Sequence, residues 1–239
     1  MNKTSSYFIY GMHTVLAALR FQPERAKKLF LARKNDIDQI LKLAKELGIQ
    51  IEQVERSWLE HKFLVGSEAQ GIVLLCSNFA YSDLDLILAS SKRLLVLDSW
   101  QDAANLGRAA RAALCFKADA IIITKDRSAE INPAAEKSAV GALAQVPVVR
   151  VVNLSAALKK IKEAGFFTYG ADERADMSIK NCDFAHRTAL VIGQEGEGLR
   201  ELTKKNCDLL ISIPMATNIC LNAADTALVL LYELYARES

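Results

Sequence analysis

The chain has 239 residues, of which 51% are hydrophobic and 24% are charged, and its formal net charge is +2. This length allows one large domain or two modest ones, and the hydrophobic fraction is high enough to build a sizeable core. The small net charge neither supports nor excludes a nucleic-acid partner, so any basic binding surface has to be local.

Targeting segments and metal sites are not indicated by the sequence. The N-terminal stretch does not resemble a secretory signal, because His13 interrupts its apolar part and no small-residue cleavage site follows. No apolar run reaches the ~20 residues of a membrane span. The five cysteines lack C-x-x-C spacing and the three histidines are far apart, which disfavours a zinc site or a disulfide framework. We therefore expect a cytoplasmic protein with no membrane anchor and no metal.

Two parts of the chain differ in pattern. Up to about residue 75 the periodicity predicts a small α/β unit, with helices at 11–20, 36–47 and 57–62 and strands at 28–32, 49–54 and 71–76. A more polar segment follows and has the composition of a connector. We therefore divide the chain into a small domain (1–78), a linker (79–92) and a larger domain (93–239).

The larger domain alternates regularly between strands and helices. Its near-continuous apolar strands are typical of a parallel sheet that is covered on both faces. The expected strands are 94–98, 120–124, 148–151, 166–169, 189–193 and 210–214, and the expected helices are 106–117, 134–144, 155–164, 199–206 and 223–237. Sheets of this class bind ligands at the carboxyl ends of their strands, and three of these ends have unusual sequences.

The first unusual end follows strand 94–98. Asn105 is expected to cap the next helix, because its side chain can accept hydrogen bonds from the exposed amides of the first turn. Gly107 and Arg111 are four residues apart and share a helix face, so Gly107 would let a backbone approach closely beneath Arg111. Solvated arginines are the alternative interpretation, but the helix is otherwise rich in alanine, and Arg108 and Arg111 lie in the turns nearest the strand end.

The second unusual end follows strand 189–193. It has three glycines spaced G-x-x-G-x-G from Gly193, with Glu195 among them, and such glycines bring backbone amides close to a ligand. The spacing is the reverse of the dinucleotide-binding fingerprint. The acidic residues of this loop would also repel a pyrophosphate. A nicotinamide enzyme is therefore a remote alternative.

The third unusual end follows strand 210–214. Pro214 ends the strand, and a loop then leads to the last helix, where Asn222 and Asp225 resemble a capping box. Cys220 lies just before this helix. It is either part of a site or a small buried hydrophobic residue, and the sequence does not decide between these two interpretations.

Taken together, the three ends resemble the SpoU (TrmH) family of RNA ribose 2'-O-methyltransferases, within the SPOUT class. The family motif N-x-G-x-x-x-R corresponds to Asn105, Gly107 and Arg111, and the motif I-G-x-E-x-x-G-L corresponds to 192–199. The third motif, I-P-M followed by S-L-N-V-S, corresponds to 213–215 and 220–224. The segments most similar to the branch that methylates a guanosine ribose of 23S ribosomal RNA are 9–19, 69–75, 125–128 and 138–142.

This resemblance implies an α/β fold with a trefoil-knotted C-terminal domain and an N-terminal RNA substrate-binding domain (1–78). It also implies a homodimer whose active sites draw on both protomers, and S-adenosyl-L-methionine as the methyl donor. By match to the family's cofactor-contacting positions, backbone groups of Gly193, Ile213 and Leu221 would hold this cofactor. Four further residues would lie near it: Thr124, Gly141, Met215 and Cys220.

Arg111 matches the residue that the family proposes as base or activator of the ribose hydroxyl. Arginine is normally fully protonated, so two roles stay open: proton acceptor, or stabiliser of the developing alkoxide. The resemblance implies that Asn105, Glu195 and Asn222 orient Arg111, the ribose and the cofactor.

Several departures from the family pattern leave alternatives open. Cys220 and Ala224 replace two serines of the third motif, and the loop before Leu221 is one residue shorter than usual. Because cysteine is a poor hydrogen-bond donor, one alternative is a non-catalytic RNA-binding or ribosome-assembly factor. A methyltransferase acting on transfer RNA ribose is another. Since the four catalytic candidates are all retained, we favour an active enzyme.

Local charge also favours an RNA partner. One basic cluster surrounds the first helix and strand and consists of Arg20, Arg25, Lys27, Lys28, Arg33 and Lys34. A second cluster flanks the candidate site and consists of Arg108, Arg111, Lys125 and Arg127. Tyr7, Phe8 and Tyr10 are candidates for stacking on bases, although core packing is expected for at least one of them.

Overall fold

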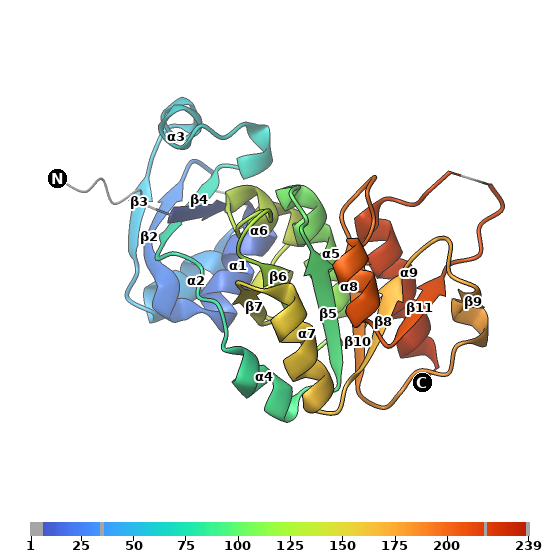
Figure 1. Ribbon diagram of the computed structural model, residues 1–239. Coiled ribbons are helices and arrows are strands. Elements are labelled where there is room, and N and C mark those ends of the chain that lie inside the picture. The colour runs from blue at the N-terminus through green and yellow to red at the C-terminus, as the bar shows by residue number, and fades with distance from the viewer. Residues whose placement is uncertain (1–6, 34–35, 218, 238–239) are drawn as a thin grey trace.

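The computed structural model describes residues 7–33, 36–217 and 219–237. Over these residues the chain folds into two β-sheets flanked by helices, with the N-terminal sheet at one end of the molecule (Figure 1). None of the helices in this described part is both long enough and apolar enough to cross a membrane.

The N-terminal sheet mixes antiparallel and parallel pairs. Its strands lie in the order β1 (Tyr7–Tyr10), β4 (Ile72–Cys76), β2 (Ala26–Leu31) and β3 (Gln50–Gln53). Leu29 and Leu31 pack into a core with α1 (Met12–Phe21) and α2 (Asp38–Glu46), whereas Phe30 packs on the other face with α3 (Arg56–Phe63). This alternation follows from the two-residue period of a strand. Two short 3-10 helices complete this part: η1 (Pro23–Arg25) and η2 (Ser67–Ala69).

The second sheet is parallel at every strand pair of the described chain. Its order is β7 (Val148–Val151), β6 (Ala120–Thr124), β5 (Arg93–Asp98), β10 (Thr188–Gly193), β8 (Phe167–Ala171), β11 (Leu209–Ser212) and β9 (Met177–Ser178). The parallel sheet predicted from the continuous apolar strands is therefore confirmed.

Helices cover both faces of this sheet, which explains why its strands are apolar throughout. Leu95 and Leu97 of β5 pack against a layer formed by α5 (Ala103–Cys115), α6 (Pro133–Ala139), η3 (Ala142–Ala144) and α9 (Ala223–Ala236). Leu94 and Val96 face the opposite layer, which contains α4 (Leu84–Ser90), α7 (Leu154–Glu163) and α8 (Glu201–Asn206). A further 3-10 turn, η4 (Ile179–Asn181), follows β9.

Two helix predictions need correction. The helix expected at 134–144 is broken, because Val140 and Gly141 adopt left-handed backbone angles with φ of 52° and 89°. The prediction that Asn105 caps α5 was wrong. Asp102 is the cap, and its carboxylate accepts from the amides of Ala104 at 2.6 Å and Asn105 at 3.0 Å. Asn105 therefore lies inside the first turn, where its side chain is free for another contact.

The segment expected as a linker is packed on the second sheet. Ser82 forms a parallel bridge with Val149, and Leu88 of α4 is buried in the core of that sheet. The segment that connects the two sheets thus runs along the surface of the larger domain, where burial of the Leu88 side chain helps to hold it.

Glu136 of α6 lies at the centre of the contact between the two parts of the chain. Its Oε1 accepts from Arg25 Nη2 at 3.0 Å and from the Tyr7 hydroxyl at 3.2 Å. A Cβ on Gly141 would stand 2.5 Å from the Cβ of Ala17 in α1, so only glycine permits this close approach. The N-terminal sheet is therefore docked firmly, and Arg25, which is buried, cannot serve the predicted basic surface.

Candidate active site

The three unusual strand ends lie on one edge of the second sheet. β10 is paired with β5 so that Gly193 stands beside Asp98, and only β8 separates β10 from β11. The helix that carries Arg111, the glycine-rich turn and the loop of the third motif all begin at this edge, as the parallel topology requires.

Asn105 and Glu195 make the contact that joins the first two motifs. The Asn105 amide, which is buried, donates from Nδ2 to Glu195 Oε2 at 3.1 Å, and the Arg108 guanidinium donates to Asn105 Oδ1. Arg108 was predicted only as a neighbour of Arg111. Its place in this network was missed, although the three-residue spacing from Asn105 was a signal for it.

Arg111 is exposed on α5, and it forms neither a hydrogen bond nor an ion pair with any residue in 7–33, 36–217 and 219–237. Gly107 does admit a close backbone, but that backbone belongs to α6. A Cβ on Gly107 would stand 2.3 Å from the carbonyl oxygen of Ala135. Tight packing on α6 thus fixes the helix, while the guanidinium of Arg111 is left available for a substrate.

Glycines shape the turn after β10. A Cβ on Gly193 would stand 2.0 Å from the carbonyl carbon of Gly198, because the chain folds straight back on itself. The amide of Gly198 donates to the Gln194 carbonyl at 3.0 Å, and both Gly196 and Gly198 have positive φ. This tight turn carries Glu195 to Asn105 and presents backbone groups at the sheet edge.

The third motif is an exposed loop that ends at a helix cap. Asn222 caps α9, with Oδ1 accepting from the Ala224 amide at 2.8 Å. Met215 and Leu221 of this loop are 37% and 40% exposed, so their apolar side chains are accessible from solvent. The interpretation of Cys220 as a buried hydrophobic residue is wrong, because this side chain is exposed.

Cys220 is held by an acidic partner. Its Sγ donates to Glu173 Oε2 at 2.6 Å, in the loop that follows β8. This hydrogen bond, together with the negative charge of Glu173, raises the pKa of the Cys220 thiol. The contact thus links the third-motif loop to the neighbouring strand end.

Native-state alkylation tests this environment. With N-ethylmaleimide at pH 8.5 we expect Cys220 to react and Cys76 and Cys207 to stay protected, because burial raises the pKa of each of these two thiols to about 12. Replacing Glu173 with glutamine should speed the labelling of Cys220, since the carboxylate that disfavours its thiolate is removed. Peptide mass spectrometry gives the rate at each cysteine. Equal rates in the two proteins would contradict the assigned contact.

Thr124 and Gly141 are placed differently from each other. Thr124 ends β6 at the same edge, where its hydroxyl bonds the Ser128 hydroxyl at 2.5 Å and so orders the 125–128 loop. Gly141 is packed against α1 of the N-terminal part. The structure therefore brings Thr124 to the carboxyl ends of the strands, whereas Gly141 packs against helix α1.

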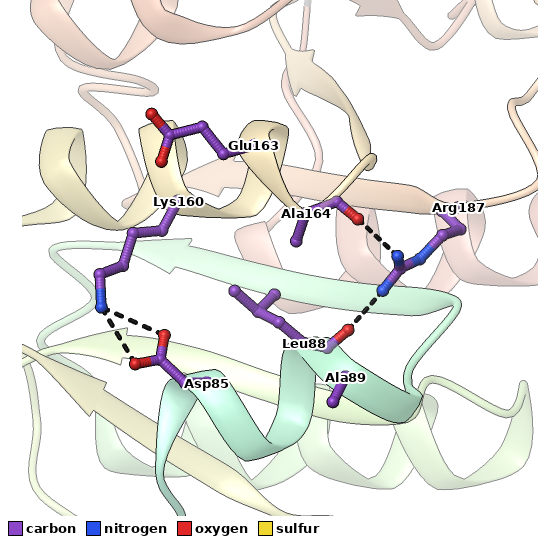
Figure 2. Close-up of a pocket in the computed structure, with 7 residues that line it drawn as sticks. All are labelled: Asp85, Leu88, Ala89, Lys160, Glu163, Ala164 and Arg187. Atoms are coloured by element: carbon purple, nitrogen blue, oxygen red, sulfur yellow. Dashed lines mark hydrogen bonds and ion pairs between the residues drawn. The ribbon is translucent and has the colours of Figure 1, made fainter.

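A cavity of about 470 Å³ lies elsewhere, between α4 and α7 (Figure 2). It is at the amino end of β10, since Arg187 directly precedes that strand. Asp85 and Lys160 pair across it at 3.1 Å, and the Arg187 guanidinium donates to the carbonyls of Leu88 and Ala164. These three charged side chains already have partners within the protein. None of the predicted site residues lines the cavity.

Comparison with known proteins identifies the family. Residues 92–232 match the SpoU rRNA Methylase family, and residues 8–82 match the family described as RNA 2'-O ribose methyltransferase substrate binding. The chain belongs to the SpoU rRNA methylase family. The resemblance inferred from the three motifs is confirmed.

Two relatives match this SpoU methylase over nearly its whole length. It is 36% identical to the 23S rRNA (guanosine-2'-O-)-methyltransferase RlmB of Escherichia coli strain K12, over 98% of this chain and 100% of that protein. It is 34% identical to the putative TrmH family tRNA/rRNA methyltransferase YacO of Bacillus subtilis, over 97% and 96%. The crystal structure of the SpoU methyltransferase AviRb from Streptomyces viridochromogenes with AdoMet has the same fold, with a TM-score of 0.84, 23% identity and coverage of 99% and 94%.

Within the described residues, no group of three or more His, Cys, Asp or Glu side chains is arranged to hold a metal ion. The polar groups gathered at the sheet edge are instead an amide, carboxylates and guanidinium groups. Such a set can orient a hydroxyl group and stabilise charge on an oxygen.

Proposed function

We propose that this SpoU methylase transfers the methyl group of S-adenosyl-L-methionine to the ribose 2'-hydroxyl of a guanosine in 23S ribosomal RNA. The observation that carries the proposal is the Asn105–Glu195 contact, which joins two family motifs on the helix that also carries the exposed guanidinium of Arg111, about 1.7 turns further along. Full-length similarity to RlmB supports both the guanosine and the 23S ribosomal RNA. This substrate places the protein in the cytoplasm.

The chemistry of the strand ends suits S-adenosyl-L-methionine. We place its site at the turn that begins at Gly193 and the loop between Ile213 and Leu221, with Thr124, Gly141, Met215 and Cys220 as further contacts. Exposed Met215 and Leu221 offer an apolar surface for a purine ring, and the glycine turn offers backbone groups. The carboxylates of Glu173 and Glu195 would repel a pyrophosphate but attract the cationic sulfonium, whose electrophilic methyl is the group transferred.

Arg111 acts on the ribose oxygen in this proposal. A 2'-hydroxyl is a weak acid and must lose its proton, which passes to solvent, as the new O–C bond forms, so charge develops on that oxygen. A guanidinium stays protonated in proteins, which favours stabilisation of the alkoxide over proton acceptance as the role of Arg111. Asn105 and Glu195 position this region through their contact, and Asn222 does so from the N-cap of α9.

We further propose that the C-terminal domain (93–239) is trefoil-knotted and that two copies of the chain form a homodimer. α5 and α9 pack against each other and share exposed apolar side chains, which include Leu114, Leu228 and Tyr232 at 38%, 44% and 55% exposure. An apolar patch of this kind is typical of a protein interface. Because α5 also carries Arg111, pairing through this face would bring the partner's residues to each active site.

The interface proposal predicts that replacing Tyr232 with glutamate yields a monomer. A charge buried between two copies is unfavourable, so the dimer should be lost in light scattering after size exclusion, together with most of the methyl transfer. Leu86→Glu is the matched control, because Leu86 is 74% exposed on α4, away from this face. A Tyr232→Glu protein that stays dimeric would refute the proposed interface.

RNA binding is assigned to the N-terminal domain (1–78), joined through the linker at 79–92, and to the loop after β6. Of the predicted basic residues, Arg25 is buried, Lys28 and Arg33 pair with carboxylates, and Lys34 lies outside the described residues. In the N-terminal domain and the loop after β6, the predicted residues that stay exposed and support the proposal are Arg20, Lys27, Lys125 and Arg127. Tyr7 is not among the stacking candidates that remain, because its hydroxyl is bonded to Glu136.

Two measurements on the purified protein test this function. Calorimetric titration with S-adenosyl-L-methionine should give saturable binding, whereas an RNA-binding factor that has lost catalysis would give none. Transfer of tritiated methyl groups should then favour a 23S ribosomal RNA fragment over bulk transfer RNA. Preferential labelling of transfer RNA would overturn the ribosomal assignment.

A further inference from the structure

Helix α8 directly follows the glycine-rich turn and is tied to a buried carboxylate on β5. Arg200, at the start of α8, places Nη2 2.6 Å from Asp98 Oδ1, and the Thr203 hydroxyl donates to Asp98 Oδ2 at 2.6 Å. Asp98 has no exposed side-chain surface. A buried carboxylate is stable only when it is fully paired, so this site is built from charge and hydrogen bonds together.

The neighbours of Asp98 extend this network to the end of β10. Asp98 stands beside Gly193 in the strand register, and Ser99 donates its hydroxyl to Asp98 Oδ1 at 2.9 Å. Ser99 does so with φ of 63°, a left-handed conformation that is unfavourable for a residue with a side chain. Next along the chain, Trp100 Nε1 donates to the Ile192 carbonyl at 3.1 Å. The strand end that precedes the turn is therefore fixed from the β5 side.

A second tie fixes α8 from the other side of β10. Lys204 Nζ lies 2.7 Å from Asp172 Oδ2, and Asp172 directly follows β8. Burial opposes ionisation of Asp172, but the hydrogen bonds from Lys204 and the Arg174 amide, together with the positive charges of these two residues, outweigh it and lower the pKa of the carboxyl group. Since β5 and β8 are the two strands that flank β10, α8 spans the end of the strand from which the turn emerges.

We infer that Asp98, Thr203 and Lys204 are positioning residues that hold the 194–199 turn in its binding conformation and thereby set the affinity for S-adenosyl-L-methionine. This inference rests on the proposed function. α8 has six residues, too few to be stable as an isolated helix, so its position depends on these ties. When they are cut, the helix frays and the turn loses the support on its C-terminal side.

A matched pair of isosteric substitutions tests the inference. Thr203→Val removes the hydroxyl that bonds Asp98. Thr188→Val removes an equally buried hydroxyl, which bonds the Ala185 carbonyl at 2.7 Å, from the amino end of β10. Titration calorimetry should show about tenfold weaker binding of S-adenosyl-L-methionine for Thr203→Val and unchanged binding for Thr188→Val. Thr203→Ser should restore the affinity, and hydrogen exchange should quicken at 194–199 only in Thr203→Val.

Lys204→Met provides a second variant, on a partly exposed side chain, in case Thr203→Val does not fold. It should weaken cofactor binding while Lys205→Met, on the same helix but exposed, does not. Wild-type affinity in both Thr203→Val and Lys204→Met would overturn the inference and leave the proposed function intact. Equal weakening by Thr188→Val would also overturn it, because the effect would then follow general stability. Wild-type protein that binds no S-adenosyl-L-methionine would overturn both.

Discussion

Replacing Arg111 with alanine is expected to lower methyl transfer by about a hundred- to a thousandfold, the usual effect of removing one group that stabilises charge on a reacting oxygen. Binding of S-adenosyl-L-methionine should be unchanged. The fold should be unchanged as well, because the side chain is exposed and has no polar contact in the part of the chain that the structure describes. Single-turnover transfer of labelled methyl groups, with calorimetry of cofactor binding, checks both expectations.

Two further variants sharpen this result. Arg111→Lys keeps the charge but loses the planar donor fork, so partial activity would identify charge as the dominant contribution. Lys159→Ala removes an exposed cation from α7, on the opposite layer, and should leave turnover at the wild-type value. Full turnover by Arg111→Ala would show that the guanidinium does not act on the ribose.

Gly193→Ala is expected to have the second large effect. The new Cβ would lie 2.0 Å from the Gly198 carbonyl carbon and 2.2 Å from the Leu199 amide nitrogen, where backbone atoms cannot yield as a flexible side chain would. The turn has to open, which should lower the free energy of unfolding by about 3 kcal/mol. Cofactor affinity should fall more than about tenfold, since a loss of 1.4 kcal/mol of binding energy suffices for that. Thermal unfolding and calorimetry measure the two effects.

Gly196→Ala is the matched control within the same turn. A Cβ on Gly196 meets nothing within 4 Å, so only its φ of +81° opposes the change. The cost should be about 1 kcal/mol. Equal losses of stability and cofactor affinity in the two alanine variants would contradict this explanation, in which Gly193 is required because residues 198 and 199 pack directly against it.

Local patterns predicted the second sheet well. β6 and β7 have the predicted bounds, 120–124 and 148–151: β6 is a short apolar run between Asp119 and Lys125, and β7 begins directly after Pro147. The start of α5 was harder to predict. Asp102 and Asn105 are both residues that cap helices well, and only the observed hydrogen bonds show that Asp102 does so.

Contacts between distant segments could not be predicted from one sequence. The pairs Asn105–Glu195 and Asp98–Thr203 join residues that are 90 and 105 positions apart, and no spacing rule connects them. The sequence analysis missed β1 for the same reason, since its partner strand β4 is more than 60 residues later in the sequence. The motifs indicated which residue types gather at the strand ends, but not which of them touch.

Gly107 shows how a motif residue can act through packing within the fold. The sequence predicted that a backbone approaches Gly107 closely, and the backbone that does so is that of α6. α6 in turn carries Glu136, which binds Arg25 of the N-terminal part. The helix of the candidate catalytic arginine is thereby packed against the element on which the N-terminal sheet docks.

Nucleoside analysis of the methylated product tests the central claim most directly. Purified protein would be incubated with S-adenosyl-L-methionine and 23S ribosomal RNA from a strain that lacks the enzyme, and the RNA would then be digested to nucleosides for mass spectrometry. We predict a gain of 2'-O-methylguanosine that depends on Arg111. A methyl group on a base, on another ribose, or on no nucleoside at all would contradict the account.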